Sequence, residues 1–325
     1  TSVNLAASLG VLEKQGKINV NQTNLFPEWN NDKRSKITLN NLLQMNSGLE
    51  WVEDYNTISD VTKMLFLEDD MTKMQQKQQL IDSPNSSWNY SSGTSNLLSG
   101  ILRQKLGNQQ EYLDYWYREL IDKIGMNSMI IETDVKGHYV ASLYAWATPR
   151  DWAKFGLLYL HKGNWEGDQL FDESWVDYVS TPTPTSDGTY GAQFWLNATP
   201  TFKDVPKNMF YADGYQGQRV FIIPSKDMVI VRMGLTEDSN FDFDHEELVG
   251  KLVYADTTLT NSNVAHGTAV AITAAGETNN STGKSSIGFN SMLQLRGMSY
   301  NELLNATYSG AKIVNASWVS GCSFS

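Results

Sequence analysis

Two β-rich runs near residue 220 constrain the fold of this chain more than any other feature. The first is Arg219-Val-Phe-Ile-Ile and the second is Met228-Val-Ile-Val-Arg-Met. Only Pro224-Ser-Lys-Asp227 lies between them, and both Pro and Asp favour a turn. We therefore predict an antiparallel hairpin over 219–233.

Helical patterns precede this hairpin. Apolar residues recur at the spacing of one helix face in four segments, which are 1–17, 38–45, 94–106 and 149–162. The expected N-caps are Thr38, then Thr94 or Ser95, and Thr148. The last helix has the clearest limits, because Pro149 suits a first turn and Gly163 suits a C-terminus. Helices followed by an antiparallel sheet predict an α+β fold.

Length and composition exclude several classes of protein. A chain of 325 residues with 41% apolar residues can bury a large core, so it is not a disordered protein. The formal charge of −11 would repel polyanions, so we expect neither nucleic acid nor an anionic membrane as a partner. No apolar run is long enough to predict a membrane span. The single cysteine, Cys322, cannot form an internal disulfide.

The composition changes near residue 254. Residues 255–291 are rich in Thr, Asn, Ser, Ala and Gly and contain no Trp or Tyr, whereas aromatic residues are frequent before them. We place a boundary at about 254–258, which divides the chain into domains 1–253 and 254–325.

One acidic run could in principle bind a metal ion. It is Asp242-Phe-Asp-His-Glu-Glu247. A solvated helix start is the favoured interpretation, because metal ligands must converge and a single run rarely achieves this. We predict no metal site and no cofactor.

Tyr90 is the first candidate for chemistry. It stands in Trp88-Asn-Tyr-Ser-Ser-Gly93, directly before an apolar helical segment. Its hydroxyl could project into a cleft from such a turn, or the ring could simply pack a loop.

Five short motifs occur in a characteristic order. They are Asn46-Ser-Gly-Leu-Glu-Trp51, Tyr90-Ser-Ser-Gly, Ile124-Gly-Met126, Thr148-Pro-Arg-Asp-Trp-Ala-Lys-Phe-Gly156 and Gly214-Tyr-Gln-Gly-Gln218. Together they resemble serine hydrolases of the β-lactamase and penicillin-binding-protein superfamily, in particular the class C-like esterase and 6-aminohexanoate-dimer hydrolase branch. The resemblance covers residues 1 to about 253. It implies an antiparallel sheet flanked by helices, with a helical subdomain.

The resemblance also implies a site. In the superfamily a Ser-x-x-Lys, a Tyr-containing turn and a Lys-Thr-Gly-like strand meet at one cleft. Tyr90 matches the second element as a catalytic residue, with Ser92 where many relatives carry Asn. The third element is matched by Tyr215, Gln216 and Gly217, and Gln218 follows them in the expected substrate and oxyanion cleft. An uncharged Tyr in place of the Lys implies an ester or uncharged amide substrate rather than a carboxylate-bearing one.

The nucleophile is not matched within the chain. The helix at 1–17 resembles the helix that follows the nucleophile, so we expect the Ser-x-x-Lys at or upstream of Thr1. The strings beginning at Ser281 and Ser309 have this spacing, but neither opens an amphipathic helix, and we interpret both as chance. The chain is therefore expected to be inactive as given. A relative that binds a ligand without catalysis is the alternative.

The tail carries a second resemblance. His266-Gly-Thr-Ala-Val-Ala, Gly288-Phe-Asn and Ala311-Lys-Ile-Val-Asn-Ala-Ser317 resemble the middle of a subtilisin-like serine protease, of α/β class. His266 would then be the general base. Neither an Asp motif before it nor a Ser after it is evident, which indicates a fragment joined to the first domain, as in a chimeric gene. Both families are often exported from bacterial cells, which favours a periplasmic or secreted protein.

Overall fold

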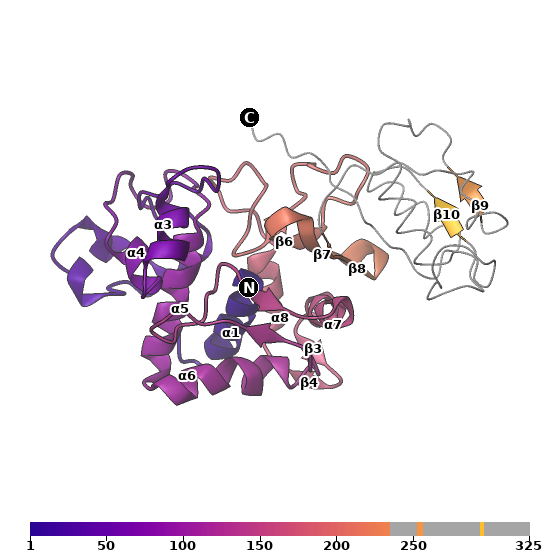
Figure 1. Cartoon of the computed structure of the whole chain (residues 1–325), viewed down its shortest axis with the longest axis horizontal. Helices are drawn as coiled ribbons and strands as arrows, with labels where there is room; N and C mark the ends of the chain where they lie inside the picture. Colours follow the sequence, from indigo (N-terminus) through magenta and orange to yellow (C-terminus); the bar gives the residue numbers. More distant parts are fainter. Residues whose placement is uncertain (235–251, 256–292, 296–325) are drawn as a thin grey trace, which may run out of the picture. The chain divides into compact units, whose positions relative to one another are not determined.

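The computed structural model describes residues 1–234, 252–255 and 293–295 (Figure 1). The chain forms two compact units. The larger unit contains Thr1–Thr201, Pro206–Asp213 and Arg219–Val231, and the smaller unit contains Phe202–Val205, Gly214–Gln218 and the residues from Arg232 onward.

Eight α-helices are present in the described residues, all within the larger unit. They are α1 (Ser2–Lys14), α2 (Leu39–Leu43), α3 (Asp60–Leu67), α4 (Thr72–Gln76), α5 (Ser92–Leu106), α6 (Gln109–Trp116), α7 (Pro149–Leu160) and α8 (Glu173–Val179). Each of the four helices predicted from the sequence is confirmed as a helix.

Helix α5 is the centre of the helical packing, since it contacts α1, α2, α3, α4 and α6. Its side chains at Leu97, Leu98 and Leu102 are fully buried. The predicted N-cap of this helix was wrong. Ser91 is the cap, and its hydroxyl accepts a 2.9 Å hydrogen bond from the backbone N–H of Thr94, so α5 begins earlier than expected.

The other predicted caps are confirmed. The Thr38 hydroxyl accepts from the backbone N–H of Asn41 at the start of α2, and the Asn41 side chain accepts from the backbone of Thr38 in return. At α7 the Thr148 hydroxyl accepts from the N–H of Asp151, and Pro149 occupies the first position. Gly163 ends this segment at φ +82°, a conformation that favours glycine.

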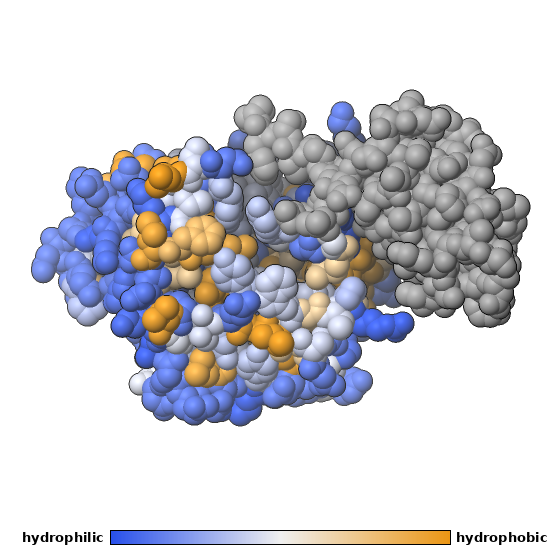
Figure 2. Space-filling view, in the orientation of Figure 1, coloured by the Kyte–Doolittle hydropathy of each residue, from blue (hydrophilic) through white to orange (hydrophobic). Residues whose placement is uncertain are grey.

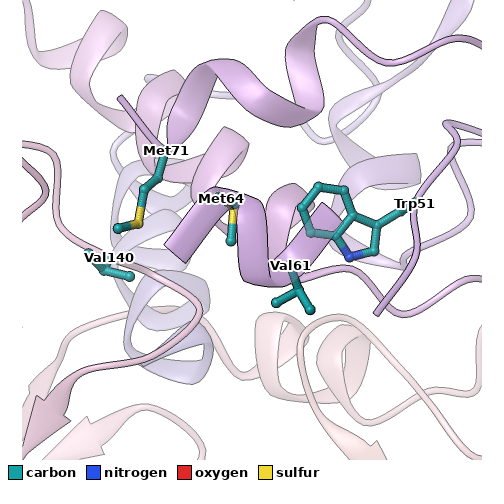
Figure 3. Close-up of a cluster of buried hydrophobic side chains, with 5 residues drawn as sticks. All are labelled: Trp51, Val61, Met64, Met71 and Val140. Carbon is teal, nitrogen blue, oxygen red and sulfur yellow. The ribbon is translucent and has the colours of Figure 1, made fainter. Parts of the chain in front are cut away.

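A cluster of apolar side chains joins the buried face of α3 to neighbouring segments (Figure 3). It consists of Trp51, Val61, Met64, Met71 and Val140. These residues come from segments far apart in the sequence, and Val61 and Met64 are fully buried. The cluster packs Trp51, in the segment after α2, against α3. This packing determines where the residues after Trp51 lie.

The sheet has four strands in the order β5-β6-β7-β8. The strands are β5 (Trp195–Leu196), β6 (Phe210–Gly214), β7 (Gln218–Ile223) and β8 (Met228–Arg232). β5 pairs antiparallel to β6, with Trp195 opposite Tyr211. The predicted hairpin is confirmed as β7 and β8. A helical turn over Pro224–Lys226 and Asp227 at φ +48° joins these two strands.

Three shorter strand pairs complete the described structure. The pairs β1 (Ile130–Ile131) with β2 (Ala145–Trp146) and β3 (Asn164–Trp165) with β4 (Asp168–Gln169) are antiparallel. In the tail, β9 (Leu252–Ala255) and β10 (Leu293–Leu295) pair in parallel. The described part of the chain has no helix that is both long and apolar enough to cross a lipid bilayer. Apolar patches interrupt the face drawn in Figure 2, and exposed large apolar residues include Ile58, Phe66 and Leu67 around α3.

Candidate active site around Tyr90

Tyr90 precedes the N-cap of α5 and is partly buried among other aromatic rings. Its ring centroid lies 5.4 Å from that of Trp195 and 6.1 Å from that of Tyr190. Trp88 contacts the same two rings at 5.8 and 5.4 Å. We call Trp88, Tyr90, Tyr190 and Trp195 the aromatic cluster. Such ring pairs stabilise their mutual orientation beyond the burial of area, so the cluster holds Tyr90 in place.

The pKa of Tyr90 is raised well above the ordinary value for tyrosine. Burial is the main cause, and Tyr190 and the carboxylates of Glu53 and Asp213 add to it. All these effects favour the neutral phenol. At neutral pH Tyr90 is therefore a hydrogen-bond donor, and it would accept a proton as phenolate only if a cation were brought beside it.

Ser92, the first residue of α5, is buried and bonded to Glu53. The Ser92 hydroxyl donates to Glu53 Oε1 at 2.5 Å, and the Ser92 backbone N–H donates to Glu53 Oε2 at 2.9 Å. A carboxylate at this position is favoured by the positive end of the helix dipole. The Ser92 hydroxyl is therefore committed to Glu53.

Glu53 and Tyr55 also lie at the candidate site, next to Ser92, although the sequence did not predict them. Glu53 also accepts from Trp51 Nε1 at 2.5 Å and from the Tyr55 hydroxyl at 2.9 Å. The Tyr55 hydroxyl lies 3.3 Å from the Ser92 oxygen, and burial together with the Glu53 charge raises the pKa of Tyr55. The only signal in the sequence is that Glu53 follows closely after the Asn46–Trp51 motif.

The 214–218 segment belongs to the smaller unit. Tyr215 is 58% exposed, and Gly217 has φ +78°, which a residue with a side chain rarely adopts. The carbonyl of Gly217 accepts a 2.7 Å hydrogen bond from Arg232 Nη1. The side-chain amide of Gln218 both donates to and accepts from the backbone of Gly234. This amide is therefore committed to shaping the segment.

The shared cleft of Tyr90 with Tyr215, Gln216, Gly217 and Gln218 stays a prediction, because these residues belong to different units. His266 lies outside the described residues, as does the acidic run 242–247.

The fold and the motif order are those of a serine hydrolase-like α+β protein. Comparison with known protein families identifies the family. The family described as Beta-lactamase matches residues 5–255. The chain belongs to the β-lactamase family. No curated protein matches the sequence.

Solved structures with the same fold have diverse activities. A Bacillus anthracis protein assigned as a 6-aminohexanoate-dimer hydrolase is 23% identical with a TM-score of 0.59, and the match covers 71% of this chain and 65% of that protein. A family VIII carboxylesterase is 14% identical with a TM-score of 0.55, covering 70% and 73%. A penicillin-binding protein from Bacillus halodurans is 17% identical with a TM-score of 0.53, covering 71% and 78%. The chain thus spans less than two thirds of the length of the Bacillus anthracis protein.

Proposed function

We propose that residues 1–253 form the cleft of a serine hydrolase that, in its complete form, cleaves an ester or an uncharged amide through an acyl-serine intermediate. The observation that carries this proposal is the position of Tyr90, directly before the N-terminus of α5 and held by the aromatic cluster. In a site of this family a tyrosine takes the proton of the attacking serine and returns it to the leaving group.

The substrate class follows from the 214–218 segment. Tyr215 stands where β-lactamases carry a lysine, so the charged contact to a substrate carboxylate is missing. The carboxylesterase among the structural neighbours supports an ester substrate.

The chain as given is proposed to be inactive, because the Ser-x-x-Lys is not matched in it. The raised pKa of Tyr90 supports this, since a neutral phenol is a weak base without a neighbouring cation. Stopped-flow mixing with a p-nitrophenyl ester should show no burst of p-nitrophenol. A longer chain that carries an upstream Ser-x-x-Lys should hydrolyse the ester.

Tyr90→Phe in that longer chain should lower kcat by about 10²–10⁴-fold, because the proton-transfer group is removed. Tyr178→Phe is the matched control, since the Tyr178 hydroxyl bonds to Asn40, away from the site. Equal losses in the two variants would refute a catalytic role for Tyr90. A burst from the chain as given would show that the nucleophile has been misplaced.

A ligand-binding relative without catalysis is the second candidate, and the neutral state of the Tyr90 phenol favours it. In that case the longer chain would bind the ester reversibly without releasing p-nitrophenol. Intact-mass measurement after incubation with a fluorophosphonate separates the two candidates, because only an activated serine would gain the mass of the probe.

The tail is proposed to be a subtilisin-like fragment in which His266 descends from a general base. It is expected to contribute no proteolysis, because an imidazole without a partner Asp and Ser is only a weak base. Casein degradation that is abolished by His266→Ala would show instead that the tail is a working protease module.

A further inference from the structure

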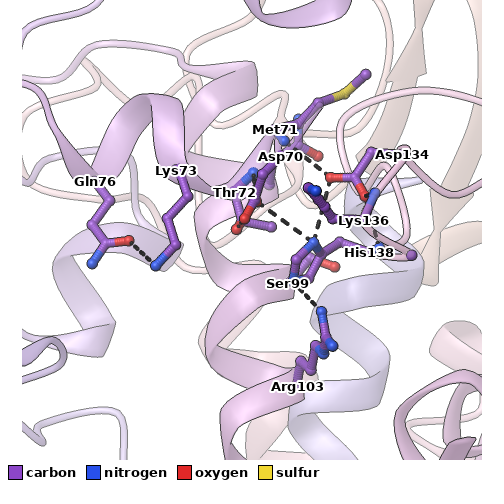
Figure 4. A network of polar contacts seen from close by, with 12 residues as sticks. Asp70, Met71, Thr72, Lys73, Gln76, Ser99, Arg103, Asp134, Lys136 and His138 are labelled. Carbon is purple, nitrogen blue, oxygen red and sulfur yellow. Dashed lines mark hydrogen bonds and ion pairs between the residues drawn. The ribbon is translucent and has the colours of Figure 1, made fainter. Parts of the chain in front are cut away.

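Three side chains of metal-ligating type meet between the start of α4 and the loop at 134–138 (Figure 4). They are Asp70, Asp134 and His138, and one ligand atom from each lies within 4.8 Å of the others. Asp134 and His138 are buried, whereas the side chain of Asp70 is 24% exposed. The cluster is therefore enclosed by protein but open to solvent on the Asp70 side.

His138 supplies the observation that points to a ligand. The residue is only 8% exposed, and its Nδ1 atom has no hydrogen-bond partner. Nδ1 points between the two carboxylates, 3.4 Å from Asp134 Oδ2 and 3.5 Å from Asp70 Oδ1. Buried polar atoms in proteins nearly always have a partner, so this nitrogen needs an explanation.

The two distances from His138 Nδ1 to the carboxylate oxygens suit a transition-metal ion. Tetrahedral zinc with bonds of 2.0–2.2 Å places its ligand atoms about 3.3–3.6 Å apart. An imidazole nitrogen with two carboxylates suits Zn²⁺ or Co²⁺ better than Mg²⁺ or Ca²⁺, which prefer oxygen ligands alone.

The backbone already orients both carboxylates. Asp134 Oδ1 accepts from the N–H groups of Lys136 and His138, and Asp134 Oδ2 accepts from the N–H of Met71. Asp70 Oδ1 accepts from the N–H and hydroxyl of Thr72. Such outer contacts hold metal ligands in position.

We propose that Asp70 Oδ1, Asp134 Oδ2 and His138 Nδ1 bind one divalent transition cation of the Zn²⁺ type, with water as the fourth ligand. The site is separate from Tyr90 and independent of the proposed hydrolase activity. A bound ion would cross-link the segment before α4 to the loop at 134–138, so its effect is on stability.

Arg103 opposes this binding. Its Nη1 lies 2.7 Å from His138 Nε2, and because a guanidinium can only donate, Nε2 accepts and Nδ1 carries the ring hydrogen. When the cation binds, Nδ1 loses this hydrogen, Nε2 gains one, and Arg103 must withdraw. The net number of protons is unchanged, and both the charge and the hydrogen bond of Arg103 compete with the ion.

Calorimetric titration of EDTA-treated protein with Zn²⁺ tests the proposal, and Co²⁺ adds a visible spectrum that reports tetrahedral geometry. We expect one equivalent to bind at this site and Tm to rise by about 4–6 °C at a free Zn²⁺ concentration of 100 times Kd. His138→Gln and Asp70→Asn should each weaken binding at least tenfold. Arg103→Gln should tighten it, because a glutamine oxygen can accept from Nε2–H.

Two histidine variants are the controls. His161→Gln changes an exposed histidine, and His245→Gln changes the histidine of the acidic run; neither should affect the site. Zn²⁺ binding that survives both His138→Gln and Asp70→Asn, or that is lost in His245→Gln, would overturn the proposal. If His138→Gln does not fold, Arg103→Gln decides, because unchanged or weaker binding in that variant contradicts the proposed competition.

Discussion

At the scale of single residues, Glu53 links three neighbours of Tyr90. Its two carboxylate oxygens accept from Trp51, Tyr55 and both the N–H and the hydroxyl of Ser92. A glutamine in its place would turn an NH₂ group toward donors, so at least one of these bonds would be lost.

Glu53→Gln should therefore lower the free energy of unfolding by about 2–3 kcal/mol, the usual cost of unpairing groups bonded to a charge. Urea denaturation measures this. The control is Glu50→Gln, an exposed residue three positions earlier, which should change stability by no more than about 0.5 kcal/mol. Similar effects of the two substitutions would show that the network around Ser92 contributes little.

The sequence indicates Tyr90 as a candidate but not Glu53, and the difference is physical. Tyr90 stands in a turn before an apolar helix, within a motif order that resembles a known family. Glu53 meets Ser92 across 39 positions of sequence, and only the packing of Trp51 on α3 brings the two together. From the sequence alone, a glutamate in a polar segment is expected to be exposed to solvent.

At the scale of elements, the N-caps of α2 and α7 could be predicted, because each is a hydrogen bond between residues three positions apart in the sequence. The start of α5 could not, since Ser91, Ser92, Thr94 and Ser95 are all suitable caps. Tertiary packing selects Ser91. Its hydroxyl lies 3.4 Å from Gln75 Oε1, and a side chain at Gly93 would meet Trp51 at 2.6 Å. Because Gly93 has no side chain, α5 can begin directly against the ring of Trp51.

The start of α7 makes stability depend on pH. Burial would raise the pKa of Asp151, but hydrogen bonds from Lys154 and Ser128 outweigh it and lower the pKa. A carboxyl group with a lowered pKa stabilises the fold above its unfolded pKa of about 4, and this contribution is lost as the pH falls through the folded pKa. Asp151→Asn should thus destabilise the protein at pH 7 and differ progressively less from the unmodified protein below about pH 4.

Denaturant unfolding at a series of pH values measures this difference. Asp122→Asn, at an exposed residue, is the control and should change stability little at any of them. A stability deficit in Asp151→Asn that persists unchanged into acid would mean that the carboxylate charge is not the cause.

At the scale of the whole molecule, the hairpin β7–β8 and an antiparallel sheet could be predicted, but the order of the four strands could not. A hairpin depends on a short turn, whereas β5 pairs with β6 through contacts that no local pattern specifies. The family match covers residues 5–255, so the assignment of the tail beyond it stays a prediction.

Limited proteolysis tests the predicted division of the chain. The polar approach at 256–263 and the Gly-containing stretch at 283–288 favour loops, so the first cuts should fall between about 254 and 290. A stable N-terminal fragment should result, and intact-mass measurement identifies its end. Early cuts within 1–253 with an intact tail would contradict the division.

The central position of α5 has a consequence for the order of folding. The side chains of Leu5, Leu9 and Leu12 on α1 are fully buried, and α1 packs on α5, which ends at Leu106. During synthesis at about 5–20 residues per second, α1 leaves the ribosome several seconds before its partner is complete. The apolar face of α1 is exposed for that interval, and its pairing with α5 must close a long loop. The nascent chain is therefore a natural client for chaperones that bind short apolar segments.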